Sequence, residues 1–147
     1  TNLGLKDVPA NAYPHRVSVT ADDVDNQGRV SNHDIVRILA EAAEAQTAAL
    51  GWDLDAYRRL GAWWVVRRHE VDYLRGARAG DELVCYTWPS AFEKLRAERR
   101  HVIVRAGDDV VVARAVNVWT LIDMETGRPK RLPPEILEAF DPAQWVV

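Results

Sequence analysis

The chain has 147 residues, of which 48% are hydrophobic and 28% are charged, and its formal net charge is -3 at pH 7. That length suits one domain with an ordinary buried core, so we expect a single domain over residues 1–147. The weak negative charge indicates neither a nucleic-acid partner nor a membrane partner. A single cysteine, Cys85, excludes an internal disulfide framework and is typical of a reducing cytosol.

The first 14 residues carry no basic-then-apolar signal pattern, and no apolar run approaches the ~20 residues that span a membrane. We therefore expect a cytoplasmic protein. Residues 1–14 are predicted to be an irregular lead-in, because Pro9 and Pro14 disfavour regular structure. In residues 15–21 valines alternate with polar residues, which predicts a half-buried strand.

A long Ala-rich helix is predicted over residues 32–50. Ser31 and Asn32 are good N-cap residues, and Asp34 favours the first turn of a helix. Gly51 is expected to stop the helix. Its small residues permit close approach of a sheet, and the expected apolar surface contains Ile35, Ile38, Leu39, Ala42, Ala43, Ala45, Gln46 and Ala49.

After a short second helix over residues 52–60, with Asp53 as N-cap and Gly61 as stop, the chain is predicted to be mostly β. Turns rich in Gly and Asp separate the expected strands, and the last two pair as an antiparallel hairpin. The predicted strands are 62–74, 82–90, 95–106 and 110–124. Residues 133–147 are expected to form a terminal helix and tail. This order predicts an α+β fold, with antiparallel strands against one main helix.

The turn before the main helix carries three acidic residues, Asp22, Asp23 and Asp25. Gly28 permits a tight turn there. The first backbone N–H groups of a helix have no partner inside it and carry partial positive charge, so they can hold a carbonyl oxygen or an oxyanion. If the chain has an active site, we therefore expect it at this turn. The alternative is that the three acidic residues are solvated side chains of a surface loop, as charged residues commonly are.

Residues 23–36 read D-V-D-N-Q-G-R-V-S-N-H-D-I-V, which resembles the signature of hotdog-fold acyl thioesterases. That signature, loosely D-x-D-x-x-G-H-V-N-N-x-x-Y-L, occurs in the 4-hydroxybenzoyl-CoA thioesterase-like group and in acyl-ACP thioesterases. The resemblance resumes in residues 68–75 and 79–83. The matching residues are Asp23, Asp25, Gly28, Val30 and Asn32. The departures are Arg29 for His, Ser31 for Asn and Ile35 for Tyr.

The resemblance implies a hotdog fold, a curved antiparallel sheet wrapped around one long central helix. It implies a thioesterase that hydrolyses an acyl-CoA or acyl-ACP to free acid and thiol, with acyl carrier protein as a possible partner. No cofactor is expected, because coenzyme A or phosphopantetheine is part of the substrate. The family also implies a homodimer or homotetramer with active sites at the subunit interface.

By this resemblance Asp25 is the catalytic carboxylate, acting either as a general base on water or as a nucleophile. Backbone N–H groups from Val30 to His33 are expected to stabilise the oxyanion. Asn32 either polarises the thioester carbonyl or caps the helix. Gln27 and Arg29 occupy the positions of an Asn and a His in plant-type acyl-ACP thioesterases, and neither can serve as a general base.

Further substrate contacts are expected from residues around the turn and on the first long strand. Arg29 either holds an acidic group of the substrate or pairs with Asp25. His33 either points into the cleft or lies exposed. Trp63 and Trp64 are adjacent on a strand, so only one of them faces the helix. The expected substrate-binding set is Gln27, Gly28, Arg29, Val30, His33, Trp64 and Tyr73.

The remaining titratable residues have ordinary interpretations. Cys85 is expected to be a small apolar residue in a strand, and His101 a lone strand histidine. Arginines such as Arg99 are expected on solvated strand faces, where some meet coenzyme A phosphates. No His, Cys, Asp or Glu set has metal-ligand spacing. Two other functions stay open: a non-catalytic module that binds acyl thioesters, and a hydratase or dehydratase, which usually has an Asp/His pair where this chain has Arg29.

Overall fold

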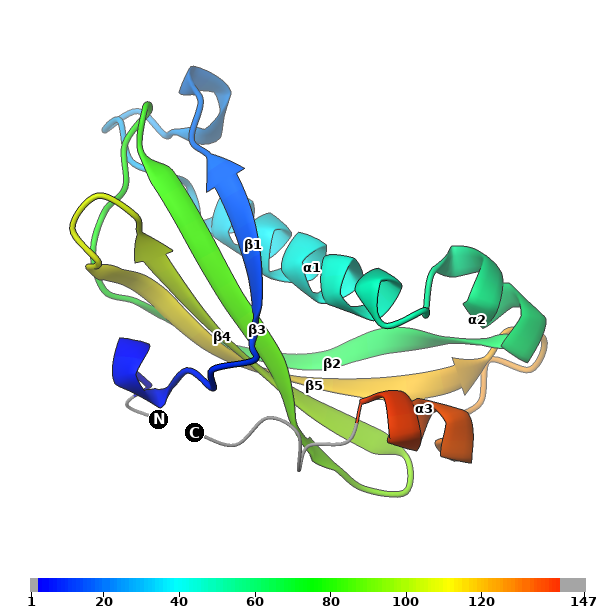
Figure 1. Ribbon diagram of the computed structural model, residues 1–147. Coiled ribbons are helices and arrows are strands. Elements are labelled where there is room, and N and C mark those ends of the chain that lie inside the picture. Colours follow the sequence, from blue (N-terminus) through cyan, green and yellow to red (C-terminus); the bar gives the residue numbers. More distant parts are fainter. Residues whose placement is uncertain (1–2, 141–147) are drawn as a thin grey trace.

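The computed structural model describes residues 3–140, which form a curved five-stranded antiparallel sheet beside one long helix (Figure 1). The sheet order is β1-β3-β4-β5-β2, so β1 and β2 are the edge strands. Register shifts interrupt the β2–β5, β3–β4 and β4–β5 ladders, and such irregularities bend and twist a sheet. The strands are β1 Tyr13–Ser18, β2 Ala62–Tyr73, β3 Glu82–Phe92, β4 Arg96–Arg105 and β5 Val111–Asp123.

Helix α1, Asn32–Ala49, lies along one face of the sheet and contacts β1 and β3. The predicted apolar face is confirmed for most of its length, with Ala42 and Ile38 almost fully buried. Ala49 is exposed, contrary to the prediction, because it lies in the last turn, beyond the part of α1 that the sheet covers. Gly51 follows the helix with φ +91°, which confirms the glycine stop.

The smaller elements agree with the sequence pattern to within a few residues. Helix α2, Leu54–Leu60, has Asp53 as N-cap and Gly61 in the left-handed conformation as C-cap, as predicted. Helix α3, Pro134–Ala139, packs near the end of the sheet, and the expected tail after residue 140 lies outside the described residues. Short 3-10 turns, η1 Leu5–Asp7 and η2 Ala21–Asp23, flank β1, which begins earlier than predicted and ends at Ser18.

Two apolar clusters fill the space between sheet and helices. One packs Ile35 and Leu39 of α1 against strands β3, β4 and β5. The other joins Tyr57 and Ile136, from α2 and α3, to the distal ends of β2 and β5. Between the two clusters lies a group of buried polar side chains: Gln46, Thr87, Arg99, His101 and Asn117.

Strand β2 is the most exposed strand of the sheet. Most of its residues are accessible to solvent, including the apolar Trp63, Val66 and Tyr73. Its outer edge has no neighbouring strand in residues 3–140. A long edge with exposed apolar side chains is a surface suited to pairing with another chain.

Candidate active site

The turn before α1 is a closed loop around Asp25. The backbone N–H of Asp25 donates to the Arg29 carbonyl at 2.7 Å, and that of Gly28 donates to the Asp25 carbonyl at 2.9 Å. Gly28 has φ +76°, a conformation that favours glycine, so this position explains the glycine of the motif. A β-bridge between Val24 and Val30 holds the two ends together.

The two carboxylate oxygens of Asp25 have different surroundings. Its Oδ1 accepts hydrogen bonds from the backbone N–H groups of Gln27 at 2.9 Å and Arg29 at 3.2 Å. Its Oδ2 has no hydrogen-bond partner within the described part of the chain. The turn therefore fixes the carboxylate while leaving one oxygen available to a reacting group.

Ser31, and not Asn32, caps helix α1. Ser31 Oγ accepts from the backbone N–H of Asp34 at 3.3 Å and donates to its carboxylate at 2.6 Å. That hydrogen bond to Ser31 is the main cause that lowers the pKa of Asp34. Asn32 is the first helical residue and its side chain is exposed, so its amide is not used in capping.

The backbone donors differ from the prediction. The N–H of Val30 donates to the Ala77 carbonyl at 2.9 Å, and the N–H of Ser31 donates to the Asp23 carbonyl at 3.1 Å. These two groups are therefore not available to an oxyanion, because closure of the turn uses them. Only the N–H groups of Asn32 and His33, from the expected set, have no acceptor among residues 3–140.

A cavity of about 270 Å³ lies between this turn and the segment that follows β2. Its wall also includes Arg75, which the sequence placed among the arginines of the strand faces, and Val112, which sequence reasoning did not single out because it is distant from the motif along the chain. Of the expected site residues, six line this cavity: Asp25, Gln27, Arg29, Val30, Asn32 and Tyr73. The structure therefore brings most of the sequence-predicted site together.

Arg29 does not form an ion pair with Asp25 in the described structure. Its side chain instead runs past Gly76, where an added Cβ would lie 3.3 Å from Arg29 Cδ. The absence of a side chain at position 76 therefore allows the arginine to lie close to the backbone. No carboxylate of residues 3–140 forms an ion pair with its guanidinium.

Three expected contacts lie outside this cavity. Gly28 shapes the turn but is not part of the wall. His33 is exposed, with 89% of its side chain accessible, and contacts Ser31. Trp64 lines a different cavity, at the other end of α1.

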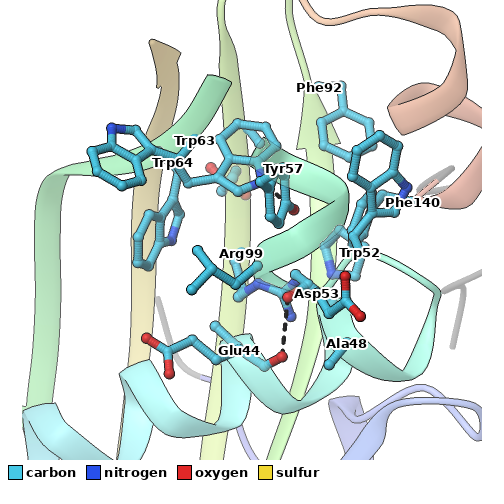
Figure 2. A pocket seen from close by; sticks show the side chains of 17 residues that line it. Glu44, Ala48, Trp52, Asp53, Tyr57, Trp63, Trp64, Phe92, Arg99 and Phe140 are labelled. Atoms are coloured by element: carbon cyan, nitrogen blue, oxygen red, sulfur yellow. Dashed lines mark hydrogen bonds between the residues drawn. The ribbon is translucent and has the colours of Figure 1, made fainter. Parts of the chain in front are cut away.

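This second cavity, of about 460 Å³, is bounded by α1, α2, the distal strand ends and Phe140 (Figure 2). Trp64 donates its indole N–H to the Tyr57 hydroxyl at 2.8 Å, which fixes both rings. Burial raises the pKa of Tyr57 to about 12, so the phenol stays protonated. The aromatic lining consists of Trp52, Tyr57, Trp63, Trp64, Phe92, Trp119 and Phe140.

Arg99 lies in this aromatic cavity, between the ring side chains and α1 (Figure 2). The expectation that it is solvated is wrong: only 7% of the residue is exposed, because α1 and α2 cover that face of β4. A signal was present in the sequence. Arg99 and His101 have the same parity along the strand as the apolar Ala97 and Ile103, and alternate residues share a face.

A chain of hydrogen-bonded side chains also crosses the sheet beneath α1. Asn117 Oδ1 is 2.6 Å from His101 Nε2, and Asn117 Nδ2 is 2.6 Å from His69 Nδ1. Cys85 Sγ is 3.8 Å from His101 Nδ1. Cys85 is buried, as expected, and burial raises its pKa, so the thiol is neutral. Residues 3–140 contain no group of three His, Cys, Asp or Glu suited to a metal ion.

Comparisons with known proteins agree with this architecture. The chain is 26% identical over 133 residues to the L-carnitine dehydrogenase/betainyl-CoA thioesterase of Agrobacterium fabrum, covering 88% of this chain and 27% of that protein. It is 22% identical over 149 residues to the acyl-[acyl-carrier-protein] hydrolase FATB1 of Cuphea viscosissima, covering 96% of this chain and 36% of that protein. The chain thus spans about a quarter to a third of the length of these curated relatives.

Solved structures show the same fold. A putative oleoyl thioesterase from Lactobacillus plantarum superposes with a TM-score of 0.84 and 26% identity, over 90% of this chain and 52% of that one. A 1,4-dihydroxy-2-naphthoyl-CoA thioesterase from Synechocystis superposes with a TM-score of 0.81 and 19% identity, over 89% and 96% of the two chains. These likenesses confirm the predicted hotdog fold. No helix within residues 3–140 is long and apolar enough to cross a membrane.

The family model of the acyl-ACP thioesterase N-terminal domain matches residues 10–140. This match includes the turn before α1, α1 itself and all the strands of the described sheet. The chain therefore belongs to the acyl-ACP thioesterase family.

Proposed function

We propose that this chain hydrolyses an acyl thioester of coenzyme A or acyl carrier protein, with Asp25 as the catalytic carboxylate. One observation supports this most directly. Asp25, with one carboxylate oxygen that has no partner in residues 3–140, shares a cavity with Asn32 at the start of α1. A carboxylate and N–H donors on one cavity are what hydrolysis of a thioester requires.

The reaction follows from these positions. A water molecule attacks the thioester carbonyl carbon while Asp25 accepts one of its protons. The carbonyl oxygen becomes an oxyanion, which the Asn32 side chain and the backbone N–H of Asn32 stabilise. The tetrahedral intermediate then breaks its C–S bond. The leaving thiolate takes the proton from Asp25, and the products are a carboxylic acid and a thiol.

Arg29 and Gln27 take the role of binding the substrate in this proposal. Neither side chain can accept a proton from water as a general base, because the guanidinium stays charged and the amide is not basic. Both line the Asp25 cavity, and Arg75 adds a second cation there. Two arginines at its wall suit the phosphate groups of coenzyme A or phosphopantetheine.

A homodimer formed through strand β2 completes the proposal. Antiparallel pairing of β2 with its own copy about the strand midpoint places the Trp63 end of one strand opposite the Tyr73 end of the other. Trp63 lines the aromatic cavity and Tyr73 lines the Asp25 cavity. This pairing therefore sets the aromatic cavity of one subunit beside the Asp25 cavity of its partner, where it can receive the acyl group.

The test is release of free thiol from a panel of short, long and aromatic acyl-CoA and acyl-ACP substrates. Asp25→Asn keeps the side-chain shape and the hydrogen bonds of the turn, and we expect it to lower kcat at least about 100-fold. Asp22→Asn is the matched control, since Asp22 is exposed on the same turn and does not line the cavity. Equal rates for Asp25→Asn and Asp22→Asn would refute the role of Asp25. Binding of thioesters without any turnover would make the chain a binding module.

A further inference from the structure

Arg99 carries a buried positive charge without a negative partner. Its Nη1 donates to the Gln46 side-chain oxygen and to Thr87 Oγ1, the latter at 3.0 Å. Both acceptors are neutral. No carboxylate of residues 3–140 lies within ion-pair distance of the guanidinium. Burial lowers the pKa of Arg99 to about 10, so the side chain is still charged at neutral pH.

The surroundings of Arg99 contain more donors than acceptors. The Nη2 and Nε groups of Arg99 have no acceptor in the described structure. Gln46 Nε2 and Trp119 Nε1 are buried and also have no partner within residues 3–140. Burying the Gln46 and Trp119 N–H groups without an acceptor costs free energy, so this arrangement suits a ligand that supplies oxygen acceptors.

The acidic residues of the same cavity do not neutralise this charge. Asp53 Oδ1 accepts the backbone N–H of Ala56 and caps α2 at 2.9 Å. Glu98 Oε1 accepts from the Ser90 hydroxyl at 2.7 Å and lies 3.3 Å from Arg100 Nε. Glu44 is exposed at the rim. The buried charge of the cavity is therefore positive, which favours an anionic group in its interior.

We propose that the aromatic cavity takes the acyl part of the substrate and that Arg99 binds a carboxylate at the far end of that acyl group. The substrate class is then the monothioester of a dicarboxylic acid with an apolar body. The aromatic side chains contact the body, and the guanidinium offers its free Nη2 and Nε donors to the two carboxylate oxygens. This inference rests on the proposed thioesterase function and names its substrate class.

The distance between Asp25 and Arg99 indicates that the two residues acting on one substrate come from different subunits. Arg99 bonds to Gln46 near the end of α1, whereas Asp25 lies just before its start. From Asn32 to Gln46 the helix rises about 21 Å at 1.5 Å per residue. An acyl group of ordinary length therefore does not join both sites within one chain. Pairing of β2 strands removes this difficulty, because it sets the aromatic cavity beside the Asp25 cavity of the partner subunit.

The kinetic test compares pairs of substrates with equal carbon number, adipoyl-CoA with hexanoyl-CoA and sebacoyl-CoA with decanoyl-CoA. We expect the wild-type protein to prefer the carboxylated member of a pair in kcat/KM. Arg99→Gln should abolish that preference, with a loss of at least about 10-fold on the carboxylated substrate. A loss of equal size on the carboxylated and the neutral substrate would overturn the inference. Arg99→Lys retains the charge and should restore part of the preference.

A binding test separates this inference from the proposed function. Free adipic and sebacic acids are titrated against the wild-type protein and Arg99→Gln, with tryptophan fluorescence as the readout and hexanoic and decanoic acids as controls. If the diacids bind more tightly than the monoacids and this difference depends on Arg99, the inference is supported. It is supported even if no thioester is hydrolysed, because that second result would refute only the proposed hydrolysis. Equal binding of diacids and monoacids, or a diacid preference that survives in Arg99→Gln, overturns it. If Arg99→Gln does not fold, diacid binding is measured instead with Arg99→Lys and as a function of salt concentration. Diacid binding that changes neither with Arg99→Lys nor with salt concentration would overturn the inference.

Discussion

His101 Nε2 lies 2.6 Å from Asn117 Oδ1 in the middle of the sheet. Because an amide oxygen only accepts, the imidazole must donate through Nε2. Asn117 Nδ2 in turn donates to His69 Nδ1 at 2.6 Å. The neutral imidazole of His101 thus has a defined tautomer, with Nδ1 facing the Cys85 thiol.

This arrangement predicts a stability that depends on pH. Burial, followed by the charge of Arg99, lowers the pKa of His101 to about 3 from its ordinary value of 6.5. Between these two values the unfolded chain binds a proton that the folded chain does not. The free energy of unfolding should therefore fall as the pH decreases from 6.5 toward 3, by up to about 1.4 kcal/mol per pH unit.

His101→Gln tests this prediction, because glutamine does not titrate and its amide can still donate to Asn117. Urea unfolding of both proteins near pH 7 and near pH 5 should give a smaller loss on acidification for the variant. Identical losses would show that His101 does not contribute to the acid sensitivity.

The two residues at the start of α1 should have separable effects. Ser31→Ala removes the cap to Asp34 and should cost about 1 kcal/mol of unfolding free energy. Asn32→Ala, at an exposed position that caps nothing, should change stability by less than about 0.5 kcal/mol. It should nonetheless lower thioester hydrolysis by about 100-fold if its amide stabilises the oxyanion. Thermal melts and thiol release on both variants measure this, and full activity of Asn32→Ala would assign the oxyanion to backbone N–H groups.

Glycine at the end of α2 is predicted to be required for its backbone conformation. Gly61 has φ +79° and caps α2. Gly107 is the matched control, because its φ lies outside the left-handed region. A Cβ added at either glycine would have no atom within 4 Å, so neither substitution creates a steric clash. Gly61→Ala should therefore destabilise the protein by about 1 kcal/mol through backbone strain alone. Gly107→Ala has no such strain and should shift the urea midpoint little. A similar shift for both would point to a shared effect on the unfolded chain.

Strand β2 is predicted to mediate self-association. Val66 on β2 and Leu137 on α3 have similar exposure, 37% and 39%. Val66→Lys places a charge on the proposed interface and should shift the protein toward monomer, whereas Leu137→Lys should not. Sedimentation velocity at several concentrations measures this shift. A wild-type protein that sediments only as a monomer would contradict the β2 dimer.

The local elements of this protein could be predicted from its sequence because their signals are local. The cap at Ser31, the stops at Gly51 and Gly61 and the alternation along the strands each depend on neighbouring residues. Asp25 likewise makes its hydrogen bonds to Gln27, Gly28 and Arg29, all within four residues of it along the chain. These interactions are specified by a short stretch of chain, so the pattern alone determined them.

Tertiary packing decided the rest. The Val30 N–H is unavailable because Ala77, far along the chain, accepts it. Arg99 lies on the same face of β4 as the apolar Ala97 and Ile103, but an arginine at such a position is buried only where a helix covers that face of the strand. Strand order and helix coverage depend on contacts between distant segments, which no local pattern contains. The sequence by itself thus determined the elements and the reactive turn, while the fold decided which donors stay free and which charge is buried.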